Sequence, residues 1–355
     1  MNNDMMPEWL ALSGSAEVPI WGMDNRERVR RLACAAKLTP PDGRKLKVDL
    51  GFVFDPLLMR LALQNPDINF THGERFVIGV DNPDARIVDL ATGPEFYNPQ
   101  LRKLERPFAL PLTAATRAQA ERACYDASYK GVTDLLTKYL WPGLAFHMTR
   151  IAAALGMSPN RITAIGAALC VWATVLFWEG MYWEGMAAGF VFMVLDTVDG
   201  KLARCTVTSS WWGNIFDHGI DLVHPPFWWG AWAVGLGSWG LAYSTETFAW
   251  VIGTIVIGYV VQRVIEGAFM RMYGGIHIHV WQKFDSRFRL ITARRNPNMV
   301  ILFVSLLFAR PDIGLVAVAW WTVLSCAVHA VRLVQAMAQA RSGHPVTSWL
   351  MEAPQ

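Results

Sequence analysis

The stretch that decides the fold runs from Asp196 to Asp221 and reads DTVDGKLARCTVTSSWWGNIFDHGID. It lies in the most hydrophobic half of the chain and contains four aspartates at fixed spacings, Asp196, Asp199, Asp217 and Asp221. Carboxylates are costly at membrane depth, so several of them together need a compensating partner such as bound cations. The stretch therefore predicts a cation site inside a helical membrane domain.

The composition is typical of a membrane protein with a soluble portion. Of 355 residues, 53% are hydrophobic and only 17% are charged, and the mean hydropathy is +0.24. Soluble domains usually carry about 25% charged residues. A net charge of +3 is too small to indicate a nucleic-acid partner. The five cysteines show no C-x-x-C spacing and are expected to be reduced. The N-terminus lacks the pattern of a cleaved signal peptide.

The chain changes character near residue 140. Residues 1–128 are charged and interrupted by Pro and Gly, which indicates a small soluble α/β domain. Its expected strands and helices are Val48–Phe54, Arg75–Val80, Pro56–Gln64 and Arg117–Ala127. Residues 129–160 are expected to be a linker and a helix lying in the membrane interface, with His147 and Arg150 toward the headgroups. An ordinary connecting helix is the alternative.

Six apolar runs follow and predict an all-α integral membrane bundle of six transmembrane helices over residues 161–340. The expected spans are Ile162–Trp178, Trp183–Leu195, Leu222–Tyr243, Thr247–Val261, Asn298–Ala309 and Ile313–Val331. Residues 341–355 are expected to be a tail.

Basic residues gather on one side of this predicted bundle. They are Lys201, Arg204, Arg263, Arg271, Lys283, Arg287, Arg289, Arg294 and Arg295. The positive-inside rule makes that side cytoplasmic. We therefore expect a multi-pass protein of the inner (cytoplasmic) membrane, with the motif, the α/β domain and the tail facing the cytoplasm.

The aspartate spacing favours a metal centre. Asp196 and Asp199 are three positions apart and Asp217 and Asp221 four apart, so each pair can share one face of a helix. Mg²⁺ and Mn²⁺ prefer such oxygen ligands. Arg204 is suited to phosphate. This combination favours phosphoryl transfer, in which one carboxylate takes a proton from an attacking hydroxyl. Polar helix packing or the ion pathway of a transporter is the alternative.

The pattern D-x2-D-G-x2-A-R-x8-G-x3-D-x3-D resembles, at all eight fixed positions, the signature of the CDP-alcohol phosphotransferase (CDP-alcohol phosphatidyltransferase class I) family. The resemblance implies six transmembrane helices around a cytosol-facing two-metal cavity, and a homodimer. It implies that Asp196, Asp199 and Asp217 are metal ligands, and that Asp221 is the general base with a metal contact. It also implies that the CDP moiety is lined by Gly200, Ala203, Arg204 and Gly213.

The acceptor is expected beneath the basic loop Gly274–Asn298. Arg289, Arg294 and Arg295 are candidates to bind an acceptor phosphate, because a guanidinium group can form bidentate hydrogen bonds with phosphate. A solvated loop touching anionic lipid is the alternative. Lys130–Asp134 and Ser158–Thr163 resemble, more loosely, the branch of the family that handles inositol phosphate. Some members of that branch carry an N-terminal nucleotidyltransferase domain. Residues 1–128 lack its glycine-rich phosphate loop, so we expect a degenerate domain.

These observations predict an enzyme of phospholipid biosynthesis. It would transfer a phosphatidyl group from CDP-diacylglycerol to a small, phosphorylated polyol such as inositol phosphate or glycerol phosphate, with release of CMP. A second possibility is a CDP-linked headgroup as donor and a lipid alcohol as acceptor. A third is an ion or metabolite transporter, although acidic residues at one membrane face are unlike a midplane transport site.

Overall fold

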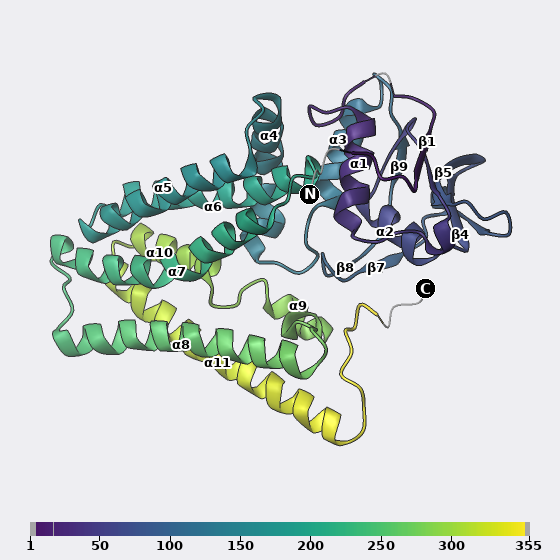
Figure 1. Ribbon diagram of the computed structural model, residues 1–355. Helices are drawn as coiled ribbons and strands as arrows, with labels where there is room; N and C mark the ends of the chain where they lie inside the picture. The colour runs from purple at the N-terminus through teal and green to yellow at the C-terminus, as the bar shows by residue number, and fades with distance from the viewer. Residues whose placement is uncertain (1–4, 17, 352–355) are drawn as a thin grey trace.

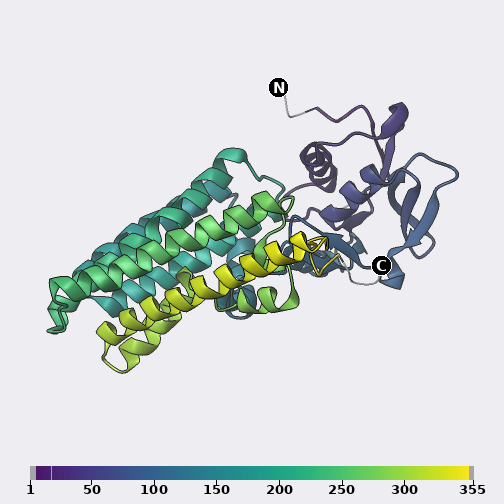
Figure 2. The same cartoon turned by 90° about the horizontal axis from the view of Figure 1, so that it is seen from below.

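The computed structural model describes residues 5–16 and 18–351, except for the side chains of Asn214, Asp217 and His218. It has an α/β region and a helical bundle that lie end to end (Figure 1). The long axes of the bundle helices point toward the α/β region when the molecule is seen from below (Figure 2). The architecture agrees with a membrane-type helical bundle carrying an N-terminal α/β region.

The α/β region is built on a mixed sheet with strand order β1-β2-β5-β4-β6. The β1/β2 and β4/β6 pairs are parallel and the others antiparallel. Two further two-stranded sheets pair β3 with β9 and β7 with β8. The strands are β1 (Leu10–Ser13), β2 (Leu46–Asp49), β3 (Phe52–Phe54), β4 (Ile68–His72), β5 (Arg75–Val80), β6 (Arg86–Asp89), β7 (Phe96–Asn98), β8 (Lys103–Glu105) and β9 (Ala109–Pro111). The helices are α1 (Asn25–Ala36), α2 (Pro56–Gln64) and α3 (Arg117–Ala127).

Local sequence explains most of these elements. Asp55 caps α2 by accepting a hydrogen bond from the Leu57 amide at 2.9 Å, and proline occupies the first turn. The predicted single strand Val48–Phe54 was wrong, because β2 and β3 belong to different sheets. The Asp49 carboxylate accepts a hydrogen bond from the Gly51 amide at 2.8 Å, which turns the chain between them.

The bundle contains the helices α4 (Trp141–Ala154), α5 (Pro159–Trp178), α6 (Tyr182–Cys205), α7 (Trp211–Gly235), α8 (Thr245–Met272), α9 (Lys283–Phe288), α10 (Arg295–Leu307) and α11 (Pro311–Arg341). Each of the six predicted spans coincides with one of these helices, allowing for differences at the ends. Among the described residues, α5, α8 and α11 are long and apolar enough to cross a membrane. The count of six transmembrane helices therefore stays a prediction. At 13 residues, α10 is shorter than the roughly 20 that a bilayer requires.

Packing joins the two regions. α5 packs against α6 and α7, and α8 packs against α11. One continuous hydrophobic cluster runs from Tyr125 of α3 through Phe146 of α4 to Phe192 of α6. Arg150, expected near the headgroups, forms an ion pair with Glu121 of α3 at 3.2 Å. α4 is thus attached to the α/β region along one side, while Leu144 and Ile151 of α4, and Leu155 just after it, are exposed.

The predicted tail is partly docked. The Trp349 amide donates a hydrogen bond to the Trp281 carbonyl at 3.0 Å, and the Ser348 hydroxyl donates to the Val280 carbonyl at 2.7 Å. Val280 and Leu350 pack together with Val132. The described end of the chain therefore covers the loop that follows α8.

Candidate active site

The aspartates lie where α6 and α7 approach the α/β region. Asp196 and Asp199 are on α6, and Asp221 is on α7. The side chain of Asp217 lies outside the described part of the structure, although its backbone belongs to α7. α7 begins after Ser210, whose hydroxyl accepts a hydrogen bond from the Gly213 amide at 3.0 Å. This cap fixes the start of the helix that carries Asp221.

Arg295 joins two of the aspartates. One guanidinium nitrogen, Nη2, lies 2.6 Å from Asp196 Oδ2, and the other, Nη1, lies 2.6 Å from Asp221 Oδ1. Arg295 opens α10 and packs its guanidinium over the ring of Phe192, 4.9 Å from the centroid. Three helices therefore meet at one charged point. Sequence reasoning had assigned Arg295 to the acceptor phosphate and missed this bridge.

Asp199 faces a different neighbour. Its side chain is 3% exposed, and Oδ2 accepts a hydrogen bond of 2.6 Å from the Thr163 hydroxyl on α5. The backbone amide of Gly200 donates to its other oxygen. Both carboxylate oxygens are thereby oriented, although sequence reasoning did not identify Thr163.

The donor set fits a divalent cation. Asp196 and Asp221 converge on a positive group, and Asp199 lies one helical turn from Asp196. Carboxylate oxygens are the ligands that Mg²⁺ and Mn²⁺ prefer. Holding several carboxylates in a partly buried place requires positive charge, which Arg295 supplies to two of them. A cation bound by Asp196 and Asp221 would compete with Arg295 for these oxygens.

The predicted donor-binding residues lie along the end of α6 and the start of α7. A side chain at Gly200 would come within 3.1 Å of an Arg204 nitrogen, so glycine lets the guanidinium fold along the helix. A side chain at Gly213 would come within 2.8 Å of Asn160 Oδ1. The Ala203 carbonyl accepts from the Thr208 amide at 2.9 Å, closing α6. The space beside the Gly200 backbone is thus taken by Arg204, and the space beside Gly213 by Asn160 and Ser210.

The remaining two predicted acceptor residues, Arg289 and Arg294, lie beside a group that sequence reasoning did not find. Arg294 Nη2 is 2.6 Å from both carboxylate oxygens of Glu266, and Arg263 Nη1 is 3.3 Å from one of them. Burial lowers the pKa of Arg289 to about 9, and the charge of Arg294 acts in the same direction. Positive charge therefore exceeds negative charge in this part of the described structure.

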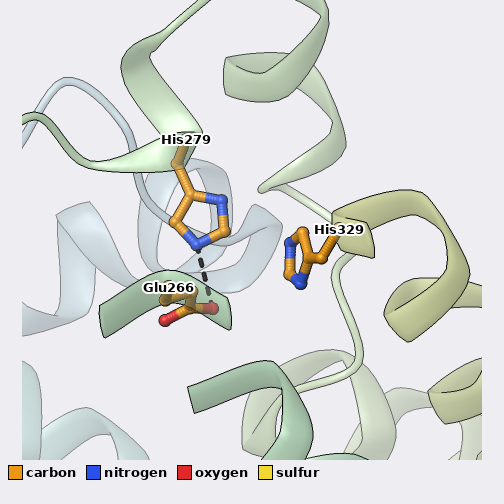
Figure 3. Close-up of side chains that lie close together, drawn as sticks. All are labelled: Glu266, His279 and His329. Carbon is orange, nitrogen blue, oxygen red and sulfur yellow. Dashed lines mark hydrogen bonds and ion pairs between the residues drawn. The ribbon is translucent and has the colours of Figure 1, made fainter. Parts of the chain in front are cut away.

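Glu266, His279 and His329 converge from α8, the 3₁₀ turn Ile278–Val280 and α11 (Figure 3). Their potential ligand atoms lie within 4.8 Å of one another, and the three residues are buried. Neither ring nitrogen of His329 has a hydrogen-bond partner among the described residues. Glu266 is already paired with Arg294, so a cation here would have to displace a guanidinium. The signal in the sequence that could have indicated this group is Glu266, a charged residue within the apolar helix α8.

The segment that carries the aspartates is similar to a known protein family. Residues 156–294 match the family model of the CDP-alcohol phosphatidyltransferases. The match contains the whole aspartate motif. It ends at Arg294, one residue before the arginine that bridges Asp196 and Asp221.

Curated relatives are similar over part of their length. Human cholinephosphotransferase 1 is 30% identical over 133 residues, which cover 34% of this chain and 32% of the human protein. Choline/ethanolaminephosphotransferase 1 of Arabidopsis thaliana is 26% identical over 218 residues, which cover 58% of this chain and 49% of the plant protein. The chain thus spans between about a third and a half of the length of these relatives.

Among solved structures, the chain is similar to the phosphatidylinositol phosphate synthase PgsA1 of Mycobacterium tuberculosis with CDP-DAG bound. The TM-score is 0.38 and the identity 17%, over 52% of this chain and 91% of that one.

Proposed function

We propose that the protein is a divalent-metal-dependent transferase of the membrane that moves a substituted phosphate group from a CDP-linked donor to an alcohol hydroxyl and releases CMP. The observation that carries the proposal is the convergence of Asp196 and Asp221 on Arg295, within a complete family motif. Three elements distant in sequence supply these groups, which is typical of a functional site.

In the proposed reaction, Asp196, Asp199, Asp217 and Asp221 would hold Mg²⁺ or Mn²⁺, two ions by the family pattern. When bound there, the metal would neutralise negative charge on the diphosphate of the donor. Asp221 accepts the proton of the attacking hydroxyl. The hydroxyl oxygen forms a bond to the transferred phosphorus as the bond from that phosphorus to the bridging diphosphate oxygen breaks, and CMP leaves. Arg204 pairs with donor phosphate, and Gly200, Ala203 and Gly213 line the CDP moiety by the family pattern.

The arginines around Glu266, one of which directly precedes Arg295 in the chain, support a phosphorylated acceptor. Arg263, Arg289 and Arg294 each have buried guanidinium nitrogens without a hydrogen-bond partner among the described residues. Glu266 is the carboxylate that Arg263 and Arg294 share. A phosphate group offers the oxygens that such nitrogens require. We therefore propose CDP-diacylglycerol as donor and a polyol phosphate, such as inositol phosphate or glycerol phosphate, as acceptor.

A second candidate reaction has support from the relatives. Both relatives described above are named as cholinephosphotransferase or choline/ethanolaminephosphotransferase. By this analogy the donor would be a CDP-linked headgroup and the acceptor a lipid alcohol. A neutral lipid alcohol would leave the unpaired guanidinium nitrogens unused, which is why we place this reaction second.

The placement in the membrane is part of the proposal. α6 and α7 have 24 and 25 residues, a length of about 36 Å, which suffices to cross a bilayer. With α5, α8 and α11, and with α10 as a sixth and shorter segment of 13 residues, they would make the six predicted membrane helices. The basic loops would place the site at the cytoplasmic face of the inner membrane. A homodimer is expected from the family resemblance.

The test uses purified protein in lipid vesicles. CDP-diacylglycerol, CDP-choline and CDP-ethanolamine are each offered with polyols, polyol phosphates or diacylglycerol, and CMP release is followed in Mg²⁺ and in Mn²⁺. We expect release with CDP-diacylglycerol and a polyol phosphate. Release only with a CDP-linked headgroup and diacylglycerol would favour the second reaction. No release from any pair would overturn the enzymatic proposal.

Two variants separate the assigned roles. Asp221→Asn should abolish turnover, because the amide cannot accept the proton. Arg294→Met should raise the KM of a phosphorylated acceptor more than that of the donor. The matched control is Arg310→Met, which removes a guanidinium from an exposed pair with Asp312. Equal effects of Arg294→Met on donor and acceptor would contradict an acceptor role.

A further inference from the structure

Lys201 is a charged residue inside the motif that the proposed reaction does not use. It lies between Gly200 and Ala203, and its side chain is only 2% exposed. Successive residues of an α-helix are turned by about 100°, so Lys201 lies roughly 140° around α6 from Asp196 and nearly opposite Asp199. The aspartates thus face the bundle while Lys201 faces the α/β region.

Aromatic rings hold the ammonium group of Lys201. Its Nζ lies 2.7 Å from the ring centroid of Tyr129 and 5.4 Å from that of Tyr125. No described carboxylate lies within ion-pair distance of it. A buried ammonium needs compensation, and the negative face of an aromatic ring provides it. These two tyrosines, called here the tyrosine pair, therefore take the place of a carboxylate partner.

The tyrosine pair is itself fixed in place. The hydroxyl groups of Tyr125 and Tyr129 are 2.9 Å apart, and the Tyr125 hydroxyl donates to the Pro142 carbonyl at the start of α4 at 3.1 Å. Tyr125 is fully buried. The rings that contact Lys201 are thus part of a rigid corner between α3 and α4.

A second contact from the α/β region reaches the same end of α6. Arg31 of α1 donates a hydrogen bond of 2.9 Å to the carbonyl of Thr206, the residue that follows α6. The end of α6 is therefore attached on two sides, by α1 and by the tyrosine pair. Rotation of α6 about its axis would break both contacts.

We propose that Tyr129 and Tyr125 are positioning residues for the aspartate motif. By binding Lys201 they set the rotation of α6, and so the direction in which Asp196, Asp199 and Arg204 point. This inference rests on the proposed function for its meaning in catalysis. By this inference the α/β region contributes to the site by orienting α6, without supplying a catalytic residue.

The test compares Tyr129→Leu, Tyr129→Phe and Lys201→Met in the full-length protein. Tyr129→Leu removes the aromatic face, whereas Tyr129→Phe keeps it and loses only the hydroxyl. The control for a tyrosine-to-leucine change is Tyr139→Leu, because Tyr139 is exposed. Mn²⁺ binding is measured directly by titration calorimetry in detergent, and kcat and KM by CMP release.

We expect Tyr129→Leu and Lys201→Met to weaken Mn²⁺ binding about tenfold, the effect of removing an outer partner of a metal site. Tyr129→Phe and Tyr139→Leu should bind Mn²⁺ as the parent protein does. Tyr129→Leu should also lower kcat more than it raises the donor KM. A double variant that combines Tyr129→Leu with Lys201→Met should bind Mn²⁺ no more weakly than either single variant, because both substitutions remove the same contact.

Two outcomes would overturn the inference: parental Mn²⁺ binding and kcat in folded Tyr129→Leu protein, or an equal loss in Tyr129→Phe. If Tyr129→Leu fails to fold, Lys201→Met decides, with its thermal unfolding as the measure of fold. Absence of CMP release from the parent protein would instead refute the proposed function, while the Mn²⁺ titration would still test the positioning role.

Discussion

Arg295 and Asp221 form an ion pair across 74 positions of sequence, with Nη1 of the arginine 2.6 Å from Oδ1 of the aspartate. The same guanidinium binds Asp196. An arginine at the start of α10 thus neutralises part of the charge that the aspartate motif brings together. The family match ends at residue 294, so it contains both aspartates but not Arg295.

Replacing Arg295 by methionine should destabilise the protein and make its stability more dependent on metal. Removing one partner of a buried ion pair typically costs 3–5 kcal/mol, and the partial exposure of Asp221 reduces the expected loss to about 2 kcal/mol. Mn²⁺ should raise the Tm of Arg295→Met more than that of the parent, because the ion supplies the missing charge. Thermal unfolding in detergent, with and without Mn²⁺, measures both effects. An unchanged response to Mn²⁺ would argue against a metal at Asp196 and Asp221.

Thr163→Val should weaken metal binding through Asp199. The variant removes the 2.6 Å hydrogen bond that orients the buried carboxylate, and leaving such a group unsatisfied costs about 1–3 kcal/mol. Thr163→Ser should retain most of the function. Thr174→Val on the same helix is the control, since the Thr174 hydroxyl bonds only to the Cys170 carbonyl among the described groups. Equal Mn²⁺ affinities for Thr163→Val and Thr174→Val would exclude this role of Thr163.

Local patterns predicted the elements better than the contacts between them. The helices Pro56–Gln64 and Arg117–Ala127 and the strand Arg75–Val80 have the predicted bounds, because caps, turns and periodicity are local. Val48–Phe54 was wrong because the change of sheet depends on strands distant in sequence.

The candidate site shows the same limit. The spacing of Asp196, Asp199 and Asp221 identified the motif, and the family match agrees with it. The partners of these carboxylates, Thr163 and Arg295, come from other helices. Which arginine of the adjacent pair Arg294 and Arg295 turns toward the aspartates depends on how α10 packs, and no sequence spacing expresses that.

Gly213→Ala should impair the start of α7. The added methyl group would lie 2.8 Å from Asn160 Oδ1 and 3.0 Å from Ser210 Oγ, so it would disturb both the α5 contact and the helix cap. Overpacking of this kind costs about 1–3 kcal/mol. Gly230→Ala on the same helix is the control, because nothing lies within 4 Å of its added methyl group. We expect a lower Tm and a higher donor KM for Gly213→Ala alone, measured by thermal unfolding and CMP release. Similar behaviour of the two variants would refute the close approach at Gly213.

Asp55 should make the α/β region less stable as pH rises. Burial, with the neighbouring charge of Glu105, raises the pKa of this carboxyl from 3.8 to about 6 in the folded protein. A folded-state pKa above the unfolded value means that the protonated form is favoured by folding. The contribution of Asp55 to the free energy of unfolding is therefore most favourable below pH 4, and it falls as pH rises through about 6.

Asp55→Asn should remove this dependence while keeping the cap of α2, because an asparagine oxygen can still accept from the Leu57 amide. Near pH 7.5 the variant should be more stable than the parent by about 1–2 kcal/mol, and the difference should vanish near pH 4. Asp89→Asn is the control of opposite sign. Hydrogen bonds from the Ala91 and Gly73 amides lower the pKa of Asp89, so its contribution is lost as pH falls. Denaturant unfolding across this pH range measures the trend, and a pH-independent difference for Asp55→Asn would contradict the raised pKa.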